Sequence, residues 1–185
     1  MPLILPDWLQ AEVDAAHAAV PSKQTARTAI SCMDLTSLKG DETEYDTIVL
    51  CEKAKANHTF SVCIYPEHLS VARRSMRETG QDIATVINFP HGDRRTLSDE
   101  PATPETTAQD TAKAIASGAT QIDIVLPYES FQKGDDDYAR SLLEACRTAC
   151  GQTRMMTILE TATFDSTDKL REACRMAIDC GTDFL

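Results

Sequence analysis

The chain alternates short, nearly continuous apolar runs with segments in which apolar residues recur at helical spacing. Runs of this kind are typical of strands that are covered on both faces, as in a parallel sheet. They predict five strands and the beginning of a sixth, at 28–35, 59–65, 82–89, 121–128, 154–161 and 182–185.

Helical patterns fill the intervals between these runs. Thr103 and Pro104 form a helix start signal, and Gly118 stands where a left-handed residue commonly ends a helix. Ser166 is a candidate N-cap for a last helix that ends before Gly181. The apolar face of that helix is expected to hold Leu170, Ala173, Cys174, Ala177 and Ile178. Further helices are predicted at 7–19, 42–56, 67–79 and around 142–150.

The repeated strand and helix pattern leaves two architectures, a doubly wound open sheet or a (β/α)8 TIM barrel. The turn after the first strand, "MDLTSLKGDET", lacks the GxGxxG pattern of a dinucleotide-binding fold, which favours the barrel. No linker divides the strands, so we expect one partial barrel domain at 28–185, preceded by an N-terminal helical extension at 1–27.

Composition and charge limit the partners, the location and the cysteine chemistry that we expect for this protein. The chain has 185 residues, 42% of them hydrophobic, and its formal net charge of -11 argues against nucleic acids and anionic membranes as main partners. No apolar run approaches the roughly 20 residues that span a bilayer, and the N-terminus lacks a signal-peptide pattern, so a cytoplasmic protein is expected. The seven cysteines form no CxxC pair, which favours reduced thiols over a disulfide framework or a metal site.

Polar residues near the carboxyl ends of barrel strands are the candidates for chemistry. Asp123 is the sharpest, because it lies in "QIDIVLPY" among apolar residues, where an ionised carboxylate must be paired, hydrogen-bonded or protonated. From the residues alone, a catalytic and a structural role are both open. Asp34 and Thr36 follow the predicted first strand, where capping of the next turn is an equally simple role.

Other candidates carry weaker signals. Cys63 is central in a strand and is typical of a small core residue. Asn88 and His91 end the third strand in "NFPHGD", where His91 suits a turn better than a ligand or a base. Glu160 and Thr161 end the fifth strand, and nothing around them selects a role.

Five stretches, which follow one another in the order of the predicted strands, resemble a single protein family. "MDLTSL", "VCIYP", "ATVINFPHG", "IDIVLPY" and "ILET", on successive strands, resemble deoxyribose-phosphate aldolase over about 30–185. The resemblance implies a (β/α)8 barrel that reversibly cleaves 2-deoxy-D-ribose 5-phosphate to D-glyceraldehyde 3-phosphate and acetaldehyde. It implies a lysine Schiff base, no metal and no organic cofactor, and a small sugar phosphate as substrate. The open strand edges of an incomplete barrel leave a homo-oligomer open as well.

The resemblance also implies roles for individual residues. Asp123 matches the aspartate that relays protons with a water molecule and a second lysine. Asp34 and Thr36 match a pair beside the substrate, and Cys63 matches a cysteine of the pocket. The apolar wall near the acetaldehyde end is matched by Phe89, Val86 and Leu38.

The sequence departs from the pattern of the family at positions where the family has lysines. In the family, the Schiff-base lysine follows a sixth-strand stretch like "TDFL", which here ends at Leu185, and Met156 stands where a lysine is usual. Lys133 and Lys169 do not match the missing positions. We therefore expect a chain truncated after the sixth strand begins, without aldolase activity as it stands.

Two other functions remain open at this point. One is a non-catalytic binding or interaction protein that completes its open barrel by oligomerisation. The other is an enzyme on a flavodoxin-like sheet, although no nucleotide or flavin motif supports it.

Overall fold

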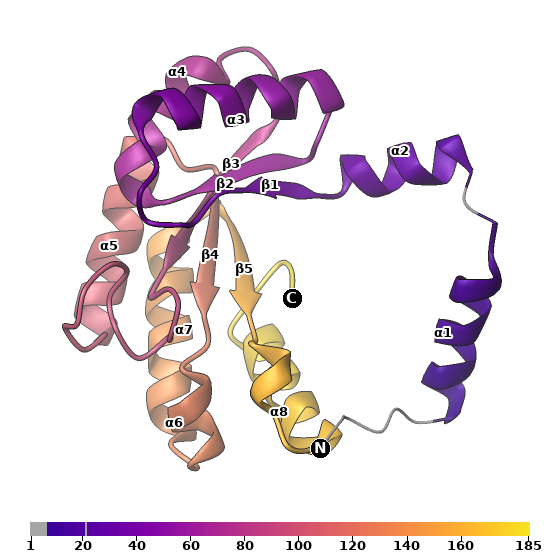
Figure 1. Cartoon of the computed structure of the whole chain (residues 1–185). Coiled ribbons are helices and arrows are strands. Elements are labelled where there is room, and N and C mark those ends of the chain that lie inside the picture. The colour runs from indigo at the N-terminus through magenta and orange to yellow at the C-terminus, as the bar shows by residue number, and fades with distance from the viewer. Residues whose placement is uncertain (1–6, 21) are drawn as a thin grey trace.

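The computed structural model describes residues 7–20 and 22–185 and is built on one parallel sheet (Figure 1). Its five strands lie side by side in the order in which they occur along the chain. They are β1 (Asp34–Thr36), β2 (Ser61–Ile64), β3 (Asp82–Ile87), β4 (Gln121–Val125) and β5 (Arg154–Ile158).

Helices connect the strands. They are α1 (Asp7–Ala18), α2 (Lys23–Ser31), α3 (Glu44–Asn57), α4 (Leu69–Ser75), α5 (Pro104–Ser117), α6 (Tyr128–Gln132), α7 (Asp136–Cys150) and α8 (Thr167–Asp179), with short 3-10 turns η1 (Pro66–His68) and η2 (Thr161–Thr163). α3 contacts β2, α4 and α5 contact β3, and α7 contacts β4 and β5. Figure 1 shows α1 and α2 extending away from the sheet.

The strand order decides between the two architectures. A doubly wound sheet reverses its order at a switch point, whereas here every strand pairs in parallel with the one that precedes it in the chain. This is the winding of a (β/α) barrel, and it confirms the predicted fold class.

The predicted sixth strand begins where expected. Phe184 forms a parallel bridge with Met156, on the edge of β5 that faces away from β4. The amide of Asp183 donates to the carbonyl of Met155 at 2.7 Å, and the amide of Thr157 donates to the carbonyl of Phe184 at 3.1 Å. The stretch "TDFL" therefore extends the sheet.

The period-2 alternation of the strands separates two apolar clusters. The larger one lies between the sheet and the helices and includes Ile122, Ile124, Leu143 and Met155. The smaller one joins Cys63, Tyr65, Ala84 and Val86, with Leu38, Phe89 and Ile158 packed against them. We call the sheet surface that carries the smaller cluster the inner face.

Several local predictions are confirmed. Thr103 caps α5 by accepting from the amide of Thr106 at 3.2 Å, and Gly118 ends that helix in the left-handed region at φ 118°. Ser166 caps α8 in the same way, by accepting from the amide of Lys169 at 3.2 Å.

The predicted first strand at 28–35 is wrong over most of its length. Ser22 accepts from the amide of Thr25 and starts α2, so the chain stays helical through Ser31. The segment "KQTARTAI" contains good helix formers, and their preference prevails because none of its side chains is buried in a sheet. The strand is therefore displaced to Asp34–Thr36.

The apolar face predicted for α8 is also partly wrong. Ile178 is 57% exposed, whereas Met176 is buried together with Ala173 and Ala177. The helix is rotated from the predicted orientation, which assigned Ile178 to the core and omitted Met176.

The two isoleucines Ile122 and Ile178 provide a matched test of this packing. Ile122→Ala is expected to lower the free energy of unfolding by about 2–5 kcal/mol, because Ile122 is fully buried and the deletion leaves a cavity. Ile178→Ala should change it by less than about 0.5 kcal/mol. Urea unfolding followed by circular dichroism measures both, and equal losses would contradict the assignment of the core.

Candidate active site

Asp123 lies in the middle of β4 with its carboxylate on the inner face. The residue is 1% exposed, and its two oxygens have separate donors. Oδ1 accepts from Nε2 of Gln121 at 2.9 Å, and Oδ2 accepts from Sγ of Cys63 at 3.6 Å. Among the residues that the structure describes, Asp123 has no cationic partner in an ion pair.

This environment raises the pKa of Asp123 to about 7. Burial is the main cause, because it removes the water that would solvate the charged form. The nearby Asp34 raises the pKa further, whereas the hydrogen bonds from Gln121 and Cys63 oppose the shift. The carboxyl group can therefore take up and release a proton near neutral pH.

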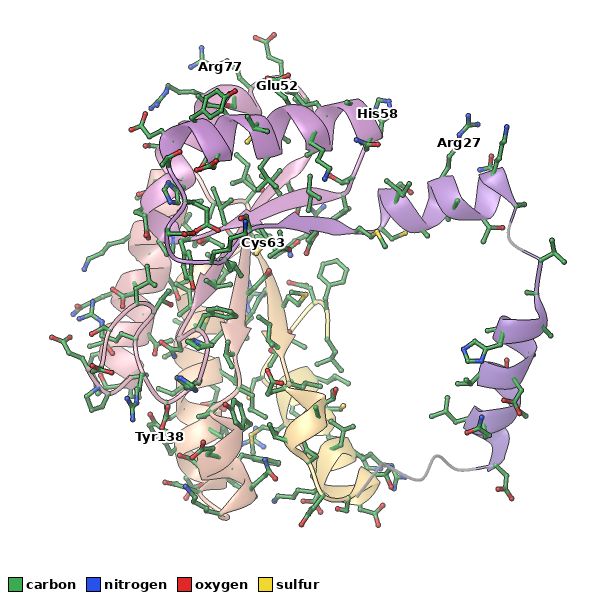
Figure 2. All side chains as sticks on the ribbon, viewed as in Figure 1. Arg27, Glu52, His58, Cys63, Arg77 and Tyr138 are labelled. Carbon is green, nitrogen blue, oxygen red and sulfur yellow. The ribbon has the colours of Figure 1, made fainter. Side chains whose placement is uncertain are left out.

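Cys63 is a hydrogen-bond donor in this site. It is 4% exposed, and burial together with the neighbouring Asp123 raises the pKa of its thiol far above the ordinary value. A nucleophilic cysteine needs the opposite shift. Figure 2 shows Cys63 at the centre of the molecule, whereas Arg27, Glu52, His58 and Arg77 lie at its periphery.

Asp34 is connected to the same group of residues. Its Oδ1 accepts from the hydroxyl of Ser61 at 2.6 Å, and its Oδ2 accepts from Nε2 of Gln121 at 3.2 Å. Asp34 begins β1 rather than following it, which corrects the expected position and places the carboxylate toward the amino-terminal end of the sheet. Thr36 is exposed, and it stands beside Cys63 in the pairing of β1 with β2.

The residues expected to form an apolar wall come together. Leu38, Val86 and Phe89 belong to the same cluster as Cys63, and Val86 is fully buried. Tyr65 completes the cluster: its ring meets that of Phe89 edge to face, with centroids 6.0 Å apart. Asp123 and this cluster therefore share one face, with Cys63 belonging to both.

The other polar candidates lie apart from this group. The amide nitrogen of Asn88 donates to the hydroxyl of Thr107 at 3.0 Å. His91 is exposed, and its Nδ1 lies 3.5 Å from the hydroxyl of Tyr128. It is followed by Gly92, where a Cβ would clash with the carbonyl oxygen of Leu126. Glu160 is exposed in a left-handed conformation.

Gln121 and Ser61 were not predicted as site residues. A signal for Gln121 was present, because it precedes Asp123 by two positions and so shares its side of the strand. Together with Asp34, Gln121 also lines an apolar pocket of about 310 Å³ near Phe60, Met156 and Phe184.

In the part of the chain that the structure describes, no cation pairs with Asp123. Met156 is its partner in the register of β4 and β5, so a thioether stands where a cation would pair. Lys133 pairs with Glu129, and Lys169 pairs with Asp136 and Glu172 while lying 4.1 Å from the centre of the Phe131 ring.

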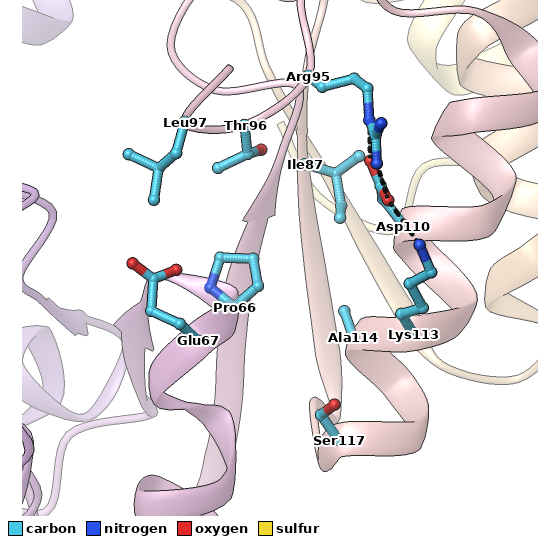
Figure 3. Close-up of a pocket in the computed structure, with 10 residues that line it drawn as sticks. All are labelled: Pro66, Glu67, Ile87, Arg95, Thr96, Leu97, Asp110, Lys113, Ala114 and Ser117. Carbon is cyan, nitrogen blue, oxygen red and sulfur yellow. Dashed lines mark hydrogen bonds and ion pairs between the residues drawn. The ribbon is translucent and has the colours of Figure 1, made fainter.

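A second pocket, of about 250 Å³, lies on the helix-covered side of the sheet between η1 and α5 (Figure 3). Its cations are paired with carboxylates: Arg95 forms two 2.8 Å hydrogen bonds with Asp110 and one of 2.7 Å with Glu100, and Lys113 lies 3.7 Å from the Asp110 carboxylate. Its lining is separate from the residues around Asp123. Within the described residues, no group of three or more His, Cys, Asp or Glu side chains could hold a metal ion.

Comparison with known proteins agrees with this arrangement. The family model for the DeoC/LacD family aldolase matches residues 28–185. The chain belongs to this family. A relation to aldolases is thus established for the part of the chain that contains the sheet and the group of residues around Asp123.

Solved structures show the same fold at low sequence identity. A candidate deoxyribose-phosphate aldolase from Coccidioides immitis is 21% identical, with a TM-score of 0.77 over 99% of this chain and 72% of that chain. One from Toxoplasma gondii ME49 is 20% identical, with a TM-score of 0.77 over 88% of this chain and 60% of that chain. The tetrameric deoxyribose phosphate aldolase from Aeropyrum pernix is 19% identical, with a TM-score of 0.73 over 89% and 70%. This member of the aldolase family thus spans 60–72% of the length of these three structures.

The raised pKa of Asp123 predicts a pH dependence of stability. The protonated form is favoured in the folded state, so its contribution is complete below the unfolded pKa of 3.8 and is lost as the pH rises through about 7. Between about pH 5.5 and 8.5 the wild type should lose roughly 2 kcal/mol through this group.

Asp123→Asn is expected to abolish that loss, because a neutral amide does not ionise. Urea unfolding at both pH values measures the difference between the two proteins. Asp179→Asn is the control, since Asp179 is exposed on α8 and should leave the wild-type dependence in place. The same pH dependence in wild type and Asp123→Asn would contradict the assignment.

Proposed function

We propose that residues 28–185 carry part of the active site of a deoxyribose-phosphate aldolase, preceded by an N-terminal extension at 1–27. The reaction is the reversible cleavage of 2-deoxy-D-ribose 5-phosphate to D-glyceraldehyde 3-phosphate and acetaldehyde through a lysine Schiff base. The observation that carries the proposal is the joining of buried Asp123 to Cys63, which also belongs to the apolar cluster of Leu38, Val86 and Phe89. The extent of the family match supports the division at residue 28.

Asp123 is proposed as the proton relay. A group that exchanges protons in catalysis works best when its pKa lies near the working pH, and burial brings the pKa of Asp123 to about 7. The buried thiol of Cys63 keeps its proton and orients one oxygen of the carboxylate. A relay of this kind serves the proton transfers that follow attack of an amine on a carbonyl.

The remaining residues are proposed to bind substrate. Asp34 and Thr36 offer a carboxylate and a hydroxyl to the polar groups of a sugar. Leu38, Val86 and Phe89 offer an apolar surface for the acetaldehyde end. This division matches a substrate that is polar along its length and carries one small apolar end.

The nucleophilic amine is the part of the reaction that the described residues, 7–20 and 22–185, do not supply at Asp123. The lysines of the chain lie on α2, α3, α5 and α8 or in exposed loops, and Lys133 and Lys169 are held in ion pairs. We therefore propose that the 185-residue chain by itself has no aldolase activity.

We also propose a cytoplasmic protein that acts on a small molecule and has no nucleic-acid or membrane partner. The net charge of -11 supports this, since it repels phosphate backbones and anionic lipids. No helix in 7–20 or 22–185 is long and apolar enough to cross a membrane. A homo-oligomer is part of the proposal, supported by the tetramer formed by the similar Aeropyrum pernix protein.

Substrate binding can be tested without turnover. Addition of 2-deoxyribose 5-phosphate to the 15N-labelled chain is expected to shift the amide signals of Thr36, Cys63, Val86 and Phe89 in NMR spectra. Inorganic phosphate is the control ligand and should leave those signals in place. Shifts confined to Lys113 and Ser117, in the pocket between η1 and α5, would contradict the proposed site.

Covalent trapping tests the absence of the amine. Borohydride reduces a Schiff base to a stable secondary amine, which mass spectrometry of the intact chain detects. Exposed lysines react weakly with aldehydes, so with 2-deoxyribose 5-phosphate or acetaldehyde we expect only weak labelling spread over several lysines, no greater than in the urea-unfolded chain, because no lysine lies beside Asp123. A single lysine labelled in high yield would show that the chain contains its own nucleophile.

A further inference from the structure

Gln121 occupies an unusual position between two carboxylates. It is 1% exposed, and its single amide nitrogen donates to Oδ1 of Asp123 at 2.9 Å and to Oδ2 of Asp34 at 3.2 Å. We propose that Gln121 is a positioning residue, which holds Asp34 and Asp123 in place and preserves the ability of Asp123 to ionise. The catalytic meaning of this role rests on the proposed aldolase function.

The bridge crosses the inner face of the sheet. Asp34 lies on β1 and Gln121 on β4, and β2 and β3 separate these strands in the sheet. Gln121, which lies 87 positions from Asp34 in the chain, therefore links the carboxylates of Asp34 and Asp123 through one nitrogen that donates to both. The contact requires the sheet to curl, since strands that are not neighbours meet only across a concave surface.

The surroundings of Asp123 make this nitrogen important. β1 presents Asp34, a like charge; β2 presents Cys63, a weak donor; and β3 and β5 present Val86 and Met156, which are apolar. Among the described residues, Gln121 thus supplies the one nitrogen donor to the Asp123 carboxylate. A hydrogen bond to the charged form favours that form, so the amide opposes the effect of burial.

Stability measurements alone would not test this role. The amide oxygen of Gln121 is buried and has no hydrogen-bond partner among the described residues, which is itself unfavourable. Gln121→Met keeps the length of the side chain and removes the unpaired oxygen together with the donor. Because these two effects oppose each other, the decisive measurement is the titration of Asp123.

The experiment follows the carboxyl carbon of Asp123 by NMR as a function of pH in the 13C-aspartate-labelled chain, with Asp123→Asn to assign the signal. Gln121→Met is expected to raise the titration midpoint of Asp123 by roughly one unit or more, because the charged form loses its stronger donor. The matched control is Gln81→Met. The amide nitrogen of Gln81 donates to the carbonyls of Thr59 and Ala54, not to a carboxylate, so the midpoint should stay unchanged.

A midpoint that stays constant or falls in Gln121→Met would overturn the proposal, as would an equal rise in Gln81→Met. Asp34→Asn provides a second test that leaves Gln121 intact. It removes the neighbouring negative charge and leaves the donor to Asp123 alone, so the midpoint is expected to fall. A midpoint unchanged by Asp34→Asn would show that the two carboxylates are not coupled.

The titration separates this inference from the proposed function, because it requires neither substrate nor turnover. A raised midpoint in Gln121→Met without binding of 2-deoxyribose 5-phosphate would leave the positioning role in place and remove the aldolase proposal. Binding at Thr36 and Phe89 with an unchanged midpoint would do the reverse.

Discussion

A buried carboxylate that has no cationic partner among the described residues is the constraint on which the inner face depends. Asp123 lies in the centre of β4, where water is excluded and ionisation is unfavourable. The protein compensates with neutral donors, since Gln121 and Cys63 each supply one hydrogen bond. These donors reach Asp123 because the sheet brings β2 and β4 onto one concave surface. The geometry of the sheet and the chemistry of the carboxylate are therefore linked.

Side chains along each strand point alternately to the two faces of the sheet, so the inner face and the helix-covered core are formed by different residues. Residues such as Ile122 and Ile124 point toward the helices and supply the burial that holds the sheet, whereas Asp123 and Gln121 point to the inner face. Substitutions on the two sides of β4 should thus have different consequences. Those on the helix side act on stability at every pH, and those on the inner face act on the protonation of Asp123 and therefore on the pH dependence of stability.

Much of this arrangement follows from local pattern. The caps at Thr103 and Ser166 and the buried position of Asp123 were predictable, because they depend on neighbours in the chain. The displacement of the first strand was not, since "TARTAI" suits a helix as well as a strand until its burial is known. Ile178 shows the same limit, because its helix has apolar residues on more than one side. The alternation places Gln121 on the same side as Asp123, but its contact with Asp34, 87 positions away, does not follow from local pattern.

The protonation of Asp123 depends on the side chain that stands beside it on β5. Met156 lies beside Asp123 in the register of β4 and β5, so the proton affinity of the carboxyl group is set by burial, by neutral donors and by the like charge of Asp34. An ammonium group introduced at this point would lower the pKa of Asp123, and the carboxylate would in turn favour the charged form of the amine. The two groups would then titrate as a pair, with Gln121 holding the carboxylate in either state. An amine placed beside Asp123 would therefore share a proton with a carboxyl group that is already held in position by Gln121.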